Sequence, residues 1–138
     1  MSKTVIEELL EEMERNVRLL EELKAESLPD FVSNPRNYLM AERCFQLAIQ
    51  CLIDIAYYLA AQNRWTKPES ASDAVKALGE HQVLDSDFAA KIVGMANFRN
   101  ILVHAYLQID RARVYKMLDE LDDFRTFTRE IITYLENE

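Results

Sequence analysis

Glycine and proline are scarce in this chain, and their scarcity limits what it can fold into. Among 138 residues there are 2 glycines and 3 prolines, too few for the many tight turns of a β-sandwich or β-barrel. Apolar residues make up 49 % of the sequence and charged residues 29 %, which is enough apolar material for a core and too much for a disordered chain. We therefore predict an all-α protein with one domain over residues 1–138.

Apolar residues recur with a helical period over most of the chain. The predicted long helices cover about residues 3–26, 35–61 and 86–103 and the segment after Asp110. A short helix is predicted between Ser70, its N-cap, and Gly79 at its C′ position. The order predicts an up-and-down bundle of about four long helices and one short helix. The helix over residues 35–61 is apolar on both faces, which indicates a central position in the bundle or a face shared with a partner.

The acidic residues gather at the two ends of the chain. Lys and Arg number 16 against 24 Asp and Glu, a formal net charge of −8. Residues 1–26 carry −4, residues 119–138 carry −5, and residues 27–118 carry +1. An acidic surface opposes broad attraction to nucleic acid, but the middle of the chain is free to hold a local cationic site.

Most sequence signatures of metal or phosphate binding are missing. The sequence has no Gly-rich phosphate loop, H-E-x-x-H, C-x-x-C or EF-hand loop. His81 and His104 are far apart, and no carboxylate cluster with metal spacing flanks either one. We therefore expect no bound metal and no cofactor.

The cysteine spacing and the N-terminal sequence both bear on the compartment in which the protein lies. Cys44 and Cys51 are seven residues apart in one predicted helix, about 10.5 Å along its axis, which is too far for a mutual disulfide. No apolar leader segment begins the chain, and Asp54 interrupts its longest apolar stretch. We predict a cytoplasmic protein without a membrane span.

One short segment before the last predicted helix combines groups that can do chemistry. It reads Arg99-Asn100-Ile101-Leu102-Val103-His104-Ala105-Tyr106. At about 100° per residue Asn100 and His104 share a helix face, whereas Arg99 can join them only if the helix ends or kinks near His104. The apolar period stops after Val103, which is consistent with a helix end there.

These side chains are suited to phosphate chemistry. An imidazole can move protons near neutral pH, and a guanidinium can bind a phosphate bidentately and stabilise charge developing on it. Together they suffice in principle for metal-free RNA cleavage, in which the ribose 2′-hydroxyl attacks its own phosphate. From the residues alone, the same three groups can equally satisfy carbonyls or contact a neighbouring helix.

The pattern R-x-x-x-x-H-x-Y in a small all-α chain resembles the HepT toxins of the HEPN superfamily. The likeness extends over nearly the whole chain, including the helix order and the helix from Tyr38 to Ala61 with its internal acid. It implies a homodimeric helical bundle that acts as a ribonuclease toxin on transfer RNA or messenger RNA. Two copies of the motif would line one cleft at the dimer interface.

The resemblance also implies a role for each residue of the motif. Arg99 would hold or neutralise the scissile phosphate, His104 would act as general acid or base, and Asn100 would position one of them. The partner would be an MNT-type minimal nucleotidyltransferase, the antitoxin of a type VII pair, which would silence the toxin by transferring AMP to Tyr106. The adenylate would add bulk and negative charge beside the phosphate-binding cation.

Supporting residues are predicted around this site. Asp54 could pair with Arg99 and orient it, or could be solvated or hydrogen-bonded across an interface. Arg111 and Arg113 follow the motif directly and are the first candidates for RNA binding. Trp65 could stack on a base, although a loop tryptophan more often covers the edge of a core.

A second function class is a non-catalytic helical subunit that binds a nucleotide or substrate for the nucleotidyltransferase. Arg99 and His104 would then hold a ligand phosphate instead of cleaving RNA. The net charge of −8 favours this alternative, because a nuclease must approach a polyanion against like charge. The intact arginine and histidine pair favours the enzyme.

Overall fold

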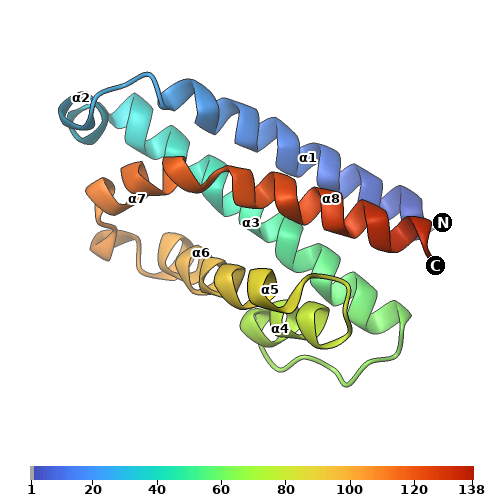
Figure 1. Cartoon of the computed structure of the whole chain (residues 1–138). Helices are drawn as coiled ribbons and strands as arrows, with labels where there is room; N and C mark the ends of the chain where they lie inside the picture. Colours follow the sequence, from blue (N-terminus) through green and yellow to red (C-terminus); the bar gives the residue numbers. More distant parts are fainter. Residues whose placement is uncertain (1) are drawn as a thin grey trace.

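The computed structural model describes residues 2–138 (Figure 1). Its helices are α1 (Ser2–Leu23), α2 (Leu28–Ser33), α3 (Pro35–Gln62), α4 (Ala71–Glu80), α5 (Ser86–Ile92), α6 (Gly94–His104), α7 (Arg111–Met117) and α8 (Asp122–Glu136). Two 3-10 turns, η1 (Tyr106–Gln108) and η2 (Leu118–Glu120), flank α7. Residues 2–138 contain no strand. The all-α prediction is therefore confirmed.

The longest helix, α3, is the central element of the bundle. It packs against α1, α2, α4, α6 and α7, and α8 lies beside α1. The apolar stripe predicted on α3 is buried: Ala41, Phe45, Ala48, Leu52, Ile55 and Leu59. Among residues 2–138, α3 is the one helix long and apolar enough to span a membrane, but 61 % of its most apolar window is buried inside the protein. This burial is typical of a core helix.

Two of the predicted long helices are each broken into two. The predicted helix over residues 86–103 is α5 followed by α6, with the joint at Val93. The last predicted helix is α7 followed by α8, separated by η2. Leu118 and Leu121 on either side of that turn are 2 % and 1 % exposed, so the bend keeps both side chains in the core. The apolar period runs through both breaks, so periodicity does not predict them. We attribute the breaks to tertiary packing.

The segment between the first two predicted helices contains the short helix α2. The Ser27 hydroxyl accepts a hydrogen bond from the Asp30 amide, which caps the helix. Phe31 is fully buried and its ring lies 5.2 Å from the ring of Tyr115 on α7. Six residues are too few to show a helical period, so this helix could not be predicted from apolar spacing.

Gly79 lies inside α4 and not at its C′ position, so this part of the prediction is wrong. The left-handed residue at the end of α4 is Gln82, with φ 61°, and the amide of Val83 donates to the carbonyl of Leu78 as in a Schellman motif. A Cβ on Gly79 would lie 2.7 Å from the Cβ of Ala89. The glycine therefore allows α4 and α5 to approach closely.

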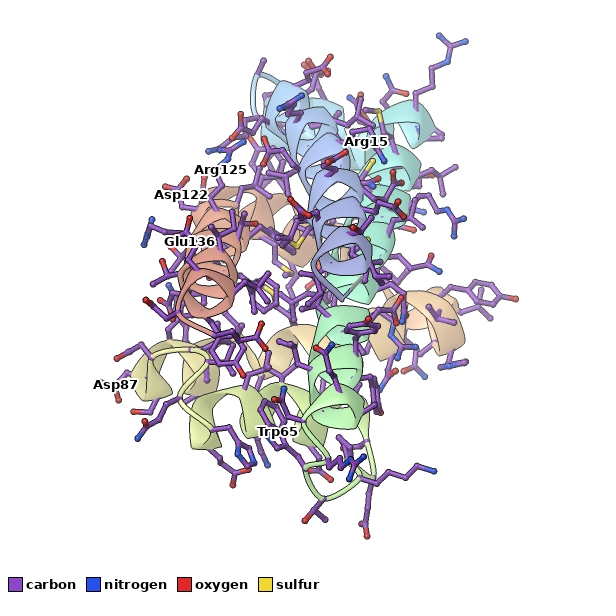
Figure 2. All side chains as sticks on the ribbon, turned by 90° about the vertical axis from the view of Figure 1, so that its right-hand side faces the viewer. Arg15, Trp65, Asp87, Asp122, Arg125 and Glu136 are labelled. Carbon is purple, nitrogen blue, oxygen red and sulfur yellow. The ribbon has the colours of Figure 1, made fainter. Side chains whose placement is uncertain are left out.

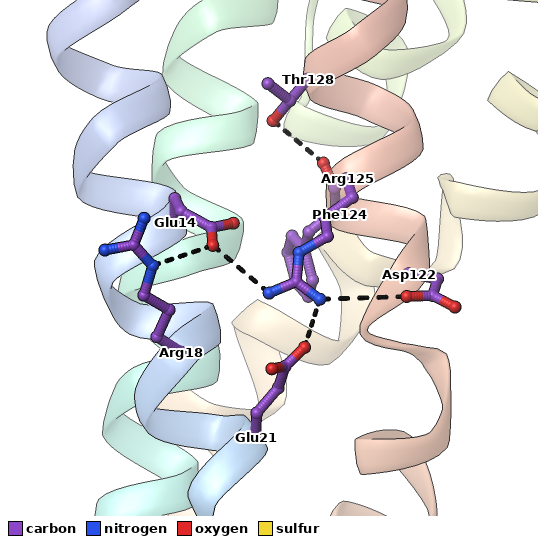
Figure 3. A network of polar contacts seen from close by, with 7 residues as sticks. All are labelled: Glu14, Arg18, Glu21, Asp122, Phe124, Arg125 and Thr128. Atoms are coloured by element: carbon purple, nitrogen blue, oxygen red, sulfur yellow. Dashed lines mark hydrogen bonds and ion pairs between the residues drawn. The ribbon is translucent and has the colours of Figure 1, made fainter.

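An ion network fastens α8 to α1 (Figure 3). Arg125 on α8 pairs with Glu21 and, at 3.3 Å, with Glu14. Glu14 also accepts a hydrogen bond from Arg18 at 3.1 Å. The Arg125 guanidinium lowers the pKa of the Glu21 carboxyl through their hydrogen bond. Part of the acidic excess at the two ends of the chain thus holds the ends together.

Candidate functional site

Helix α6 positions the predicted motif and ends where the sequence predicted. Phe98 is buried and packs edge-on against Phe45 of α3, with ring centroids 5.9 Å apart. The last helical residue is His104, and Ala105 leaves the helix with φ −126° and ψ 41°. Asp110 then caps α7 by accepting hydrogen bonds from the amides of Ala112 and Arg113. The predicted helix end is confirmed.

The four motif side chains lie between the last turn of α6 and η1. Asn100 and His104 are exposed, and Tyr106 is 67 % exposed. Arg99 is half-buried, and its Nε atom is buried without a hydrogen-bond partner in the described part of the chain. A guanidinium nitrogen left without a partner carries a desolvation cost, which a bound anion or a residue from another subunit would remove. No hydrogen bond or ion pair among the described residues joins the four side chains to one another.

The predicted pairing of Asp54 with Arg99 does not occur within one chain. Asp54 is exposed and its Oδ1 accepts a hydrogen bond from Nε2 of Gln50 at 2.7 Å. Phe98, the residue before Arg99, lies against Phe45 of α3. Phe45 is nine residues before Asp54, so these two residues are about 13.5 Å apart along the axis of α3. The alternative in which Asp54 is solvated or bonded across an interface stays open.

The two arginines that follow the motif lie over aromatic rings of the core helices. Cζ of Arg111 is 3.7 Å from the centroid of the Tyr38 ring, and Cζ of Arg113 is 5.9 Å from that of Phe98. Neither guanidinium forms an ion pair with a carboxylate of the described residues. Stacking of this kind holds a cation in place while leaving its N–H donors free. The site therefore presents fixed positive charge beside the end of α6.

Glu42 is a half-buried carboxyl at this site that was not predicted. It lies one turn after Tyr38 on α3, and burial raises its pKa while the charge of Arg111 opposes that rise. The sequence signal was present but ambiguous, because an acid on a helix that is apolar on both faces can be solvated or enclosed. The fold encloses Glu42 because α7 folds back over α3.

Trp65 follows the C-terminal end of α3 and covers an edge of the core. It is half-buried, packs against the core and stacks on His81 with ring centroids 4.0 Å apart. His81 is the C-cap of α4. One face of the indole is thus already covered, which leaves less room for a stacked base.

The two cysteines are buried and form no mutual disulfide, and the second of these findings agrees with the prediction from their spacing. Burial raises the pKa of the Cys51 thiol to about 11, so it is not a nucleophile at neutral pH. Within residues 2–138 no group of three or more His, Cys, Asp or Glu side chains is placed to hold a metal ion.

Solved structures share the fold of this chain. A tri-AMPylated HEPN toxin from Shewanella oneidensis, in complex with an MNT antitoxin, superimposes with a TM-score of 0.85 and 20 % identity over 94 % of this chain and 97 % of that one. A toxin–antitoxin complex with AMP-PNP gives a TM-score of 0.82 and 20 % identity over 92 % of this chain and 97 % of that one. The fold is thus that of all-α HEPN toxins.

Sequence comparison narrows the class to a family. The family model described as Ribonuclease HepT-like matches residues 13–131. A protein named tRNA nuclease HepT, from Aphanizomenon flos-aquae, is 31 % identical over 132 residues, which is 95 % of this chain and 90 % of that protein. The chain belongs to the Ribonuclease HepT-like family.

Proposed function

We propose that this protein is a metal-independent endoribonuclease toxin that cleaves transfer RNA or messenger RNA and is silenced by an MNT-type nucleotidyltransferase antitoxin. The observation that carries the proposal is the end of α6, where the partly buried Arg99 and the exposed His104 have no carboxylate partner in the described chain. The 31 % identical relative is named as a tRNA nuclease, which supports an RNA substrate. A toxin that cleaves RNA and pairs with such an antitoxin would act in the cytoplasm.

The proposed reaction is transesterification within the RNA. The 2′-hydroxyl loses its proton to a base and attacks the adjacent phosphorus, the bond to the 5′-oxygen breaks, and that oxygen takes a proton from an acid. Arg99 would bind the phosphate and stabilise its added charge, and His104 would transfer a proton. Asn100, exposed one turn before His104, would position one of these groups. The products would carry a 2′,3′-cyclic phosphate and a 5′-hydroxyl.

The proton balance favours a homodimer. The step needs a base and an acid at once, and each chain contributes one histidine to the motif. Two chains facing each other would supply two imidazoles to one composite cleft. Apolar side chains exposed on the outer face of α3 and on η1 support such an interface: Leu39 56 %, Tyr57 37 % and Leu107 88 %. Asp54 lies on the same face of α3 as Tyr57 and could then orient Arg99 of the partner subunit.

Tyr106 is the proposed AMP acceptor. Its ring is 67 % exposed two residues after His104, so a nucleotidyltransferase can reach the hydroxyl. An adenylate there would bring negative charge and bulk next to Arg99 and exclude the RNA phosphate. Arg111 and Arg113, free of carboxylate partners in the described chain, would contact the RNA backbone on either side of the cleaved bond.

A non-catalytic subunit that binds a nucleotide or substrate for the nucleotidyltransferase is the second candidate function. The formal charge of −8 favours it, because the whole molecule repels a polyanion. Under this alternative Arg99 and His104 bind a phosphate group and no bond is cleaved.

Incubation of purified protein with total RNA and excess EDTA separates the two functions. The wild type, with Tyr106 shown by mass to be unmodified, should give fragments with cyclic phosphate ends, and Arg99→Ala and His104→Ala should give none. His81→Ala removes the other histidine, which caps α4, and serves as the matched control that should still cleave. Intact RNA with all four proteins would refute the nuclease and favour the binding subunit.

A further inference from the structure

A groove lies between α1 and α8. It has a volume of about 700 Å³ and an apolar floor made by Leu10, Ile132 and Leu135. Ile132 is 43 % exposed, whereas Leu10 and Leu135 are nearly buried. The groove therefore exposes the apolar side chain of Ile132 to solvent beside two buried leucines.

The rim of the groove carries negative charge without partners. Glu7, Glu11 and Glu136 line it and are exposed, and none of them forms an ion pair with a side chain of residues 4–138. The two arginines of the lining, Arg15 and Arg18, already pair with glutamates of their own helix. The charge available to a ligand is therefore negative.

The groove has the length of a short helix. Its lining on α1 extends from Glu7 to Arg18, eleven residues and so about 16.5 Å along the helix axis. Three turns of a second helix span the same length, and its apolar residues at i, i+4 and i+7 would meet the floor. Basic residues flanking that stripe would lie beside the three glutamates.

We propose that this groove is the docking site for a cationic amphipathic helix of a partner protein. Charge decides against two other occupants. RNA would meet the uncompensated glutamates, and a second copy would bring another acidic α1–α8 face against this one. The groove lies near the chain termini, at the opposite end of the molecule from the turn η1 that follows His104 (Figures 1 and 2). Docking here would leave the motif accessible, and the proposal does not depend on ribonuclease activity.

Methyl NMR of the whole protein tests the site directly. The probe is a 15-residue peptide of leucine and lysine with leucines in the amphipathic helical pattern, and its control is a scrambled peptide of the same composition. The patterned peptide should shift the methyl signals of Leu10, Ile132 and Leu135 and leave that of Ile109, next to η1, unchanged. The scrambled peptide should bind about tenfold more weakly, since it offers charge without an apolar stripe.

Variants separate the groove from general acidity. Ile132→Glu and the double variant Glu7→Gln/Glu11→Gln should each weaken binding of the patterned peptide about tenfold. The matched control is Asp87→Asn/Asp119→Asn, which removes two exposed charges outside the groove lining and should bind like the wild type. Circular dichroism would show that each variant is folded.

Two results would overturn the proposal. Equal weakening by the Asp87→Asn/Asp119→Asn control, or equal binding of the scrambled peptide, would show attraction to net charge alone. A change in sedimentation of Ile132→Glu relative to wild type without peptide would show that the groove is an interface between copies of this chain.

Discussion

The α1–α8 side of the molecule and the α6–η1–α7 side use the same residue type in opposite ways. On the α1–α8 side three of the four arginines pair with carboxylates, namely Arg15, Arg18 and Arg125, and Arg129 is exposed. On the other side the arginines have no ion pair with the described residues: Arg99, Arg111 and Arg113. Arginine whose charge is matched within the chain stabilises the fold, whereas arginine left unmatched is available to an anionic ligand. The formal net charge of the whole chain does not reveal this difference between the two sides.

Replacing one arginine on each side by alanine is the strongest test of this comparison. Arg99→Ala should lower the rate of RNA cleavage at least about 100-fold, because the charge on the reacting phosphate loses its partner. Arg125→Ala should leave that rate within about twofold of wild type, since its contacts are with Glu14, Glu21 and Asp122. Initial rates on a labelled RNA measure both. A comparable loss in the two variants would mean that the distinction between the sides is wrong.

The α4–α5 joint offers a test of packing in which neither set of arginines takes part. Gly79→Ala should lower the free energy of unfolding by about 2 kcal/mol, because its new Cβ would lie 2.7 Å from the Cβ of Ala89. Gly94→Ala, where a Cβ would meet nothing within 4 Å, is the matched control and should raise it by about 0.5 kcal/mol. Urea unfolding measures both. Equal effects would show that α4 and α5 can separate at no cost.

Acid should abolish the contribution of the α1–α8 network to stability. Arg125→Ala should cost about 1 kcal/mol at pH 7 and low salt, a modest value because the ion pairs are partly exposed. The pKa of Glu21 is lowered from its ordinary value of 4.5 by Arg125. Its contribution is therefore fully present above that value and is lost as the pH falls through the lowered pKa.

Urea unfolding of wild type and Arg125→Ala at pH 7 and at pH 3 measures this loss. The difference between the two proteins should shrink at pH 3 and also in high salt. A difference that is the same at both pH values would assign the effect to packing of the arginine side chain and not to its charge.

The sequence was informative wherever one local rule governs the structure. The apolar stripe of α3 and the helix end at His104 followed from periodicity, and both are confirmed. The joint at Val93 could not be predicted, because its backbone stays helical, with φ −54° and ψ −35°, and the apolar period continues through it. Contacts between distant segments decide such features, and a single sequence does not record them.

The candidate site shows the same limit. The motif residues were found because they are close in sequence, whereas the enclosure of Glu42 depends on α7 folding over α3. The pairing of Asp54 with Arg99 was expected from residue type alone, and Asp54 instead accepts a hydrogen bond from Gln50. Helix periodicity gives the face of a residue but not its distance from a residue on another helix.

Arg111 gives the smallest and most discriminating prediction. Its guanidinium is held over the Tyr38 ring, so Arg111→Ala should remove about one phosphate contact and reduce the salt dependence of RNA binding by about one unit of slope. The matched control is Arg129→Ala, which removes an exposed charge from α8 and should leave the slope unchanged. Binding of a noncleavable RNA to the His104→Ala background at several salt concentrations measures the slope. Equal slopes for Arg111→Ala and its parent would show that the unmatched arginines after the motif do not touch RNA, and Arg99 alone would then carry the cationic character of this side.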